Sequence, residues 1–187
     1  MKNKFVIGII AVVALLILWM WSSYNSMVKA NLAVDTQWAQ VEAQYQRRFD
    51  LIPNLVASVQ GVMTQEKDVF TAIANARQGY AGAKTVDEKA QAASQVESAL
   101  GRLLVITENY PVLASSQNVK DLMTQLEGTE NRISVERTRF NDDVNTFNTK
   151  VMTFPGSLLA SLFGFEKRSF FQAAAGSDVA PAVKLNQ

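Results

Sequence analysis

Carboxylates are the side chains of this chain with the clearest capacity for chemistry. Glu127 and Glu130 are three residues apart, which places both on one side of a helix, whereas the adjacent Asp142 and Asp143 point to different faces. Paired carboxylates are used as general acid and base by hydrolases and as oxygen ligands for Ca²⁺ or Mg²⁺. A di-iron site in a helical bundle also needs histidine, and the chain contains none.

The overall composition excludes most other catalytic sites. The 187 residues include neither Cys nor His, so disulfides, thiol nucleophiles, zinc ribbons and Ser-His triads are absent. No glycine-rich phosphate loop or nucleophile elbow is present. The 18 basic and 17 acidic residues give a formal net charge of +1, which argues against nucleic-acid binding. The sequence therefore predicts a protein that is not an enzyme, has no metal or cofactor and acts through partners.

An uninterrupted apolar run near the amino terminus predicts a transmembrane helix. Residues 5–21 carry no charge and would span about 25 Å as a helix, slightly less than a hydrocarbon core. Trp19 and Trp21 suit the headgroup level at one end, and Lys2 and Lys4 flank the other. A cleaved signal peptide is the alternative, but bulky side chains occupy the place where a cleavage site needs small ones.

The flanking charges predict how the span is oriented. Residues 1–4 carry Lys2 and Lys4, and the first basic residue after the run is Lys29. The positive-inside rule then leaves residues 1–4 in the cytoplasm and places the bulk of the chain on the extracytoplasmic side.

Residues 22–156 read as an antiparallel bundle of three to four long helices, which makes the fold all-α. Apolar residues recur at steps of three and four, and no stretch alternates as a strand does. Residues 22–52 continue from the span without Pro or Gly, and Pro53 predicts a bend or a new helix. Residues 79–82 (GYAG) predict a loop.

The later helix boundaries also have local signals. Thr85 and Glu88 have the spacing of a capping box, so a helix should begin there. Pro111 should end that helix, and Pro155 should end a last long helix that starts near residue 117. Gly101 and Gly128 lie inside predicted helices, where each either permits a close helix contact or is merely tolerated.

Polar residues close to the apolar stripes predict an internal network near Pro53, in which Arg102 or Arg132 meets Glu127 or Glu130. Buried networks of this kind set the register of a bundle. The alternative is a set of solvated pairs on the helix surfaces. The candidate residues are Arg47, Arg48, Asp50, Asn54, Arg102, Glu127, Glu130, Asn131 and Arg132.

The carboxyl-terminal segment 157–172 is dense in apolar and aromatic residues. It either packs on the bundle or forms an exposed patch that contacts a second subunit, a partner or the membrane interface. The candidate contact residues are Leu158, Leu159, Leu162, Phe163, Phe165, Phe170 and Phe171. Residues 173–187 are rich in Ala and Pro and predict a disordered tail.

Several motifs occur in the order typical of one bacterial family. They are RRFDLIPNLV at residues 47–56, LGRLL at 100–104, LEGTENRI at 126–133, FP at 154–155 and FGF at 163–165. With these motifs the chain resembles the LemA family over roughly residues 20–171. Phe140 stands where the family often has Tyr.

The resemblance implies a helical domain anchored in the bacterial inner membrane, with membrane proteins such as a membrane protease among its possible partners. It supplies no catalytic residues. The leading functional hypothesis is a homo-oligomeric, non-enzymatic envelope protein that scaffolds membrane partners. The alternatives are a single-pass sensor of a ligand or of envelope stress, and a hydrolase that uses Glu127 and Glu130.

Overall fold

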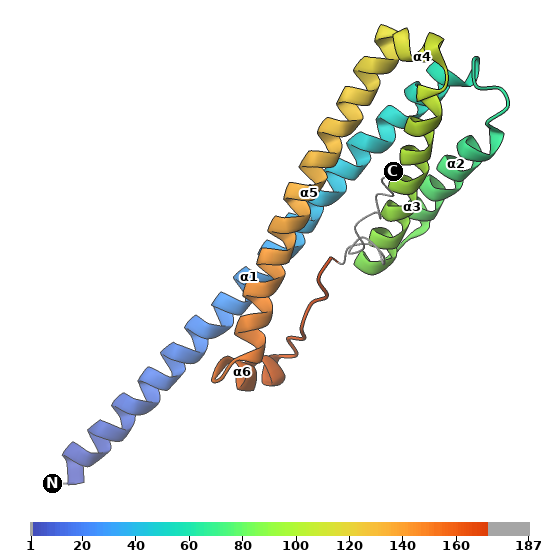
Figure 1. Cartoon of the computed structure of the whole chain (residues 1–187). Coiled ribbons are helices and arrows are strands. Elements are labelled where there is room, and N and C mark those ends of the chain that lie inside the picture. Colours follow the sequence, from blue (N-terminus) through green and yellow to red (C-terminus); the bar gives the residue numbers. More distant parts are fainter. Residues whose placement is uncertain (1, 172–187) are drawn as a thin grey trace, which may run out of the picture. The chain divides into compact units, whose positions relative to one another are not determined.

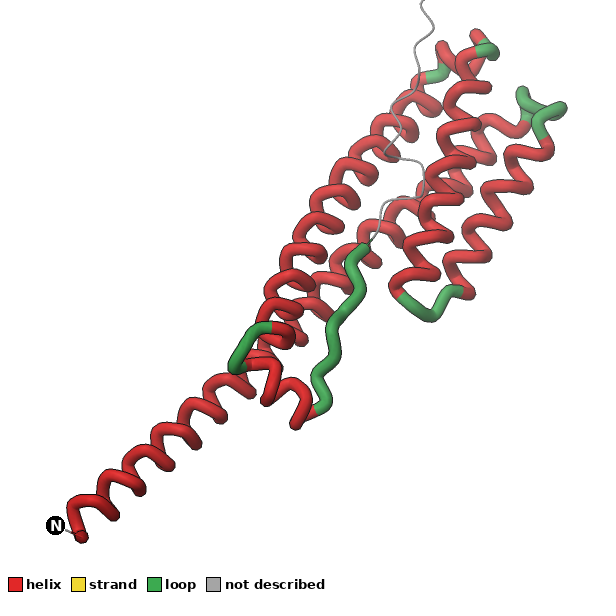
Figure 2. Tube along the Cα trace, turned by 60° about the horizontal axis from the view of Figure 1, so that its bottom comes forward, coloured by secondary structure: helices red, strands yellow, loops and turns green. Residues whose placement is uncertain are grey.

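The computed structural model describes residues 2–171, which form six α-helices and no strand (Figure 1). Between the helices there are only short connections (Figure 2). The helices are α1 (Lys2–Gln60), α2 (Lys67–Gly82), α3 (Val86–Glu108), α4 (Pro111–Ser115), α5 (Gln117–Met152) and α6 (Gly156–Phe163). The all-α prediction is confirmed. The predicted disordered tail lies outside the described residues.

The described chain divides into two compact units. The first contains the residues up to Val41 together with Glu136–Phe170, and the second contains Glu42–Val135 and Phe171. Both α1 and α5 contribute residues to each unit, because each helix passes a boundary between them.

In the first unit, α1 and α5 lie side by side and antiparallel. Lys150 donates a hydrogen bond from Nζ to Ser26 Oγ over 2.6 Å, and Gln37 donates from Nε2 to Glu136 Oε2 over 2.6 Å. Residues early in α1 therefore pair with residues late in α5. The core between them consists of apolar side chains from α1, α5 and α6: Met27, Val34, Val41, Phe140, Val144, Phe147, Val151 and Leu159.

The amino-terminal part of α1 differs from the rest of that unit because its apolar side chains are exposed. Among the described residues, α1 is the one helix long and apolar enough to cross a membrane, and none of its most apolar stretch is buried. Phe5 is 73% exposed and Leu18 63% exposed. A helix of a soluble core would bury such side chains, so this stretch has the surface of a membrane-spanning segment.

The second unit packs α2, α3 and α4 with the adjoining parts of α1 and α5. α2 and α3 form a helical hairpin around residues 83–85, and Tyr80 of α2 places its ring 4.7 Å from that of Phe49 in α1. Asn118 donates to Ser58 Oγ over 3.0 Å, so α1 and α5 are antiparallel here as well. Fully buried side chains include Tyr45, Leu55, Val59, Met63, Ile73, Leu103 and Ile133.

The capping box predicted at the start of α3 is confirmed. Thr85 Oγ1 accepts from the backbone N–H of Glu88, and the Glu88 carboxylate accepts from the backbone N–H groups of Lys84 and Thr85. The hydrogen bond from Lys84, followed by that from Thr85, lowers the pKa of Glu88 from its ordinary 4.5.

A lowered pKa in the folded state means that ionised Glu88 stabilises the fold at neutral pH. That contribution is present above the unfolded pKa of about 4.5 and is lost as the pH falls through the folded value. We expect Glu88→Gln to lower the thermal midpoint at about pH 7 and to have a smaller effect at about pH 3. Thermal unfolding of both proteins in mild detergent measures this. An equal loss at both pH values would contradict the assignment.

Of the two alternatives predicted for Pro53, the start of a new helix is wrong, because Pro53 lies inside α1, which ends at Gln60. Proline removes one backbone hydrogen bond, and helix packing on both sides compensates for it. Phe49 and Ile52 before the proline and Leu55 and Val59 after it are all at most 4% exposed. The chain instead leaves the helix between Gly61 and Glu66.

The loop predicted at residues 79–82 is also wrong, since α2 continues to Gly82. Gly79 faces α3 at ordinary packing distance, because a Cβ built at Gly79 would lie 4.0 Å from the Cβ of Ala92. Packing between α2 and α3 therefore overrides the low helix propensity of glycine.

The close-contact explanation for Gly101 and Gly128 fails as well, because a Cβ at either position meets no atom within 4 Å. We expect Gly101→Ala and Gly128→Ala each to stabilise the fold by about 0.5–1 kcal/mol, since alanine has the higher helix propensity. Gly156→Ala is the control with the opposite expected effect, because a Cβ at this position would lie 2.3 Å from the backbone oxygen of Lys150. We expect it to destabilise the fold by about 1–3 kcal/mol. Urea unfolding followed by circular dichroism measures all three, and a loss of stability in the first two would contradict the expectation.

Candidate functional site

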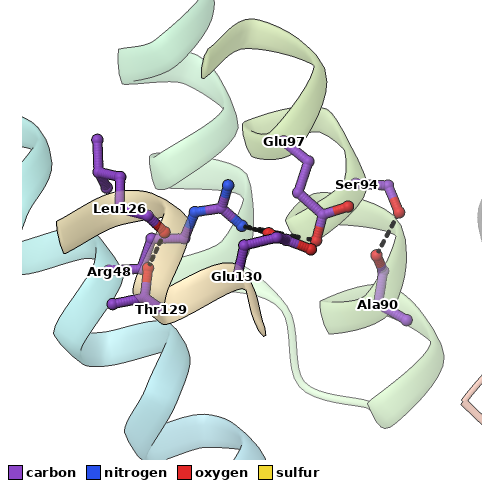
Figure 3. Close-up of polar contacts among 7 residues, drawn as sticks. All are labelled: Arg48, Ala90, Ser94, Glu97, Leu126, Thr129 and Glu130. Carbon is purple, nitrogen blue, oxygen red and sulfur yellow. Dashed lines mark hydrogen bonds and ion pairs between the residues drawn. The ribbon is translucent and has the colours of Figure 1, made fainter. Parts of the chain in front are cut away.

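Arg48 is a buried charged residue at the centre of an ion-pair cluster in the second unit. Its side chain is 8% exposed, and its guanidinium forms an ion pair with Glu130 of α5 (Figure 3). The same Nη1 lies 3.8 Å from Oε1 of Glu97 in α3. One cation therefore connects three helices that are distant in sequence.

Helical spacing places each member of this cluster on the core side of its helix. Arg48 lies three residues after the buried Tyr45 and four before the buried Ile52. Glu97 lies four residues after the buried Ala93 and three before the buried Leu100. Residues three and four apart share a helix face, so all such side chains point toward the core.

The hydroxyl groups beside the cluster are satisfied within their own helices. Buried Thr129 donates to the backbone oxygen of Leu126 over 2.7 Å, and Ser94 donates to that of Ala90 over 3.1 Å (Figure 3). The carboxylates are thus the groups that neutralise Arg48. Its Nε is buried and finds no acceptor within the described structure.

The chemistry of this arrangement is structural. A guanidinium stays protonated in proteins and offers a fixed fork of donors, so it holds carboxylates but does not exchange protons at neutral pH. Glu130 is engaged in the ion pair, whereas Glu127 is exposed. Among the described residues, no group of three or more His, Cys, Asp or Glu side chains is arranged to hold a metal ion.

A second ion pair joins α1 to α3 in the same unit. Lys89 of α3 pairs with Glu42 of α1, and its Nζ lies 6.0 Å from the centre of the Tyr80 ring. The two lysine contacts bring α1, α2 and α3 together at the end of the unit where α3 begins.

The sequence prediction named two of the three members of the Arg48 cluster and assigned the arginine wrongly. Arg102 and Arg132 are exposed, because their positions on α3 and α5 fall outside the buried stripes. Asp50 accepts a hydrogen bond from Gln46 on the surface of α1, over 2.8 Å. The other exposed members of the predicted network are Arg47, Asn54, Glu127 and Asn131.

Glu97 is the member that sequence reasoning missed. Its spacing from Ala93 and Leu100 was a usable signal, since a charged residue within a buried stripe needs a partner. The same helical periodicity explains why Arg48 is buried while the adjacent Arg47 is exposed.

The carboxyl-terminal apolar residues differ in exposure, and the contacts predicted for the exposed ones stay a prediction. Leu159 and Phe171 are buried, and Phe165 is half-buried with its ring 6.3 Å from that of Phe147. The remaining members of the predicted contact set are exposed: Leu158, Leu162, Phe163 and Phe170.

A polar groove runs between α2 and α3 in the second unit. Its volume is about 460 Å³, and amide side chains from both helices line it, among them Asn75, Gln91 and Gln95. Arg102 also lines this groove, so the exposed arginine lies beside neutral hydrogen-bonding groups.

Comparison with known proteins identifies one family and several related proteins. The model of the LemA family matches residues 37–185. The magnetosome proteins MamQ 1 and MamQ 2 of Paramagnetospirillum magneticum are each 25% identical to this chain over 199 aligned residues, which cover 92% of the chain and 72% of those proteins. MamQ of Magnetospirillum gryphiswaldense is 36% identical over 81 residues, which cover 43% of the chain and 30% of that protein.

Proposed function

The chain belongs to the LemA family, and from this we propose that it is a non-enzymatic membrane-anchored protein of the bacterial envelope that self-assembles or scaffolds membrane partners. Family membership and the magnetosome relatives support a membrane-associated helical protein. The observation that carries the proposal is the exposed apolar stretch of α1, which belongs to the same helix as the folded residues up to Gln60.

Anchoring supports assembly through concentration. A protein confined to a membrane meets lateral partners at a raised effective concentration, so contacts of modest affinity suffice. The face of α1 that carries the exposed Leu32 is a candidate contact surface.

Light scattering coupled to size exclusion in mild detergent tests this proposal. We expect the full-length protein to run as a multiple of its 20.6 kDa mass, or to co-purify with a membrane protein. A strict monomer at high protein concentration with no co-purifying protein would contradict both self-assembly and scaffolding.

We also propose that the bulk of the chain lies outside the cytoplasm, because Lys2 and Lys4 precede the apolar run. The chain has no cysteine, so one cysteine at the exposed position Ala39 reports its own accessibility. We expect a membrane-impermeant thiol reagent to label it in intact spheroplasts. Labelling only after lysis would reverse the orientation.

A sensor is the second candidate, and the groove between α2 and α3 favours it. Amide groups together with Arg102 suit a polar or anionic small ligand. A thermal-shift screen with ions and envelope metabolites should then find a stabilising compound whose effect is lost in Arg102→Ala. A screen without any such compound would weigh against this function.

A further inference from the structure

The first unit contains a cleft at the level where the apolar run of α1 ends. Its volume is about 320 Å³, and it lies between α1 and the turn that connects α5 to α6. Trp19 belongs to the apolar run and lines this cleft together with Phe154 and Pro155. The turn is therefore beside the last apolar turn of the proposed membrane helix.

The opposite side of the cleft is polar and positively charged. Lys150 lines it with hydroxyl groups from α1 and from the end of α5, including Ser22 and Ser26. The Lys150 ammonium donates to Ser26 Oγ over 2.6 Å. Among the described residues, no carboxylate lies within 4.0 Å of it. A lysine side chain offers three donors, so after the hydrogen bond to Ser26 two remain for an anionic oxygen.

The surface next to the cleft is apolar and open. Phe154 is 80% exposed, Leu158 65% and Leu162 68%. The two leucines are four residues apart on α6, so they share one face. The neighbouring face of α6 packs within the unit, because Leu159 is buried and the Phe163 ring lies 4.8 Å from that of Tyr24 in α1.

The cleft and its surroundings resemble a phospholipid site in two respects. The lysine and the hydroxyl groups suit an anionic headgroup, and the exposed leucines suit acyl chains. Trp19 and Trp21 mark the headgroup level on α1, and the cleft is at that level. We propose that this cleft holds an anionic phospholipid headgroup at Lys150, while Phe154, Leu158 and Leu162 lie in the acyl region of the same leaflet. The proposal rests on the membrane anchoring of α1. A second copy of the chain fits less well, because these residues adjoin a helix whose neighbours are already lipids.

Depth-dependent quenching in vesicles tests the position of α6. The full-length chain carries one cysteine at a time, at Leu162, at Leu18 or at Ala39, each labelled with an environment-sensitive fluorophore. The vesicles contain phosphatidylcholine and phosphatidylglycerol with spin labels on shallow acyl positions. We expect at least threefold stronger quenching at Leu162 than at Ala39, which lies about 27 Å beyond Trp21 along the helix.

The Leu18 label separates this proposal from the anchoring on which it rests. Quenching at Leu18 together with Leu162 quenched no more than Ala39 would overturn the position of α6 and leave the anchor intact. No quenching at Leu18 would overturn the anchoring and this proposal with it. If the label at Leu162 were not quenched by the spin-labelled lipid and became protected from water only at high protein density, a second copy of the chain would cover this surface. That outcome would also overturn the proposal.

The headgroup contact is tested by the lipid that stays bound. After extraction in mild detergent with equal amounts of phosphatidylglycerol and phosphatidylcholine, native mass spectrometry counts lipids per chain. We expect phosphatidylglycerol to be retained at least fivefold better by the natural protein and by Lys150→Arg than by Lys150→Gln. Equal retention by all three overturns the headgroup site. Displacement of the lipid by an equimolar amount of inorganic phosphate also overturns it, because a free anion would then be the preferred ligand.

Discussion

Replacing Glu97 and Glu130 together with glutamine is expected to lower the free energy of unfolding by about 3 kcal/mol, because it leaves the Arg48 charge buried without a counter-charge. The Arg48 side chain is 8% exposed and gains little from water. The two glutamates are 27% and 39% exposed, so their own solvation changes far less than that of the arginine. Urea unfolding of the full-length protein in mild detergent, followed by circular dichroism, measures the loss.

A third substitution distinguishes the unpaired charge from a general packing defect. Arg48→Met in the double glutamine background removes the buried cation and keeps a side chain of similar length. We expect this triple variant to be more stable than the double variant, by about 1–2 kcal/mol. If Arg48→Met instead deepened the loss, or if the double variant unfolded like the natural protein, the cluster would not hold the three helices as described.

This cluster shows which part of the fold is encoded locally and which part is not. Helical periodicity places Arg48, Glu97 and Glu130 on core faces, and that much is legible in the sequence. Which arginine meets which glutamate depends on the relative rotation of three helices that are far apart in the chain. The sequence prediction chose Arg102 or Arg132, and both lie between the buried stripes rather than on them.

The ends of helices also divide into those set by local sequence and those set by tertiary packing. The capping box at Thr85 and Glu88 is a local hydrogen-bonded structure, and it forms where the sequence predicts it. Pro53 and Gly79 also carry local signals for a break, yet both lie inside helices. In these two places tertiary packing on both sides of the residue outweighs an intrinsic preference of a few kcal/mol or less.

The apolar residues of α6 were identified from composition, but composition does not say which of them are covered. Leu158 and Leu159 are adjacent and chemically identical, and the first is 65% exposed while the second is 4% exposed. That difference arises from the direction in which α6 leaves the turn at Pro155, and nothing in the residue types determines it.

Arginines at the middle of the apolar run are expected to release the protein from the membrane. Leu, Ile, Phe and Val side chains contribute about 0.3–0.6 kcal/mol each to insertion, and a central arginine costs about 2.5–3.5 kcal/mol. Val12→Arg with Val13→Arg therefore costs about 5–7 kcal/mol, which is comparable to what the whole run contributes. Both valines are exposed, at 57% and 48%, so the change leaves the folded core untouched.

The matched control places the same two charges at the end of the run, as Ser22→Arg with Ser23→Arg. Arginines there reach the headgroups, so we expect this variant to remain in the membrane pellet after carbonate extraction. The central variant should move largely to the soluble fraction while keeping the circular dichroism of a helical protein. The intact mass of the natural protein decides the signal-peptide alternative, because a cleaved chain would be lighter than 20.6 kDa. If the central variant stayed in the carbonate-resistant pellet, residues 5–21 would not be what anchors this chain, and the lipid contact at α6 would need another anchor to bring it to the bilayer.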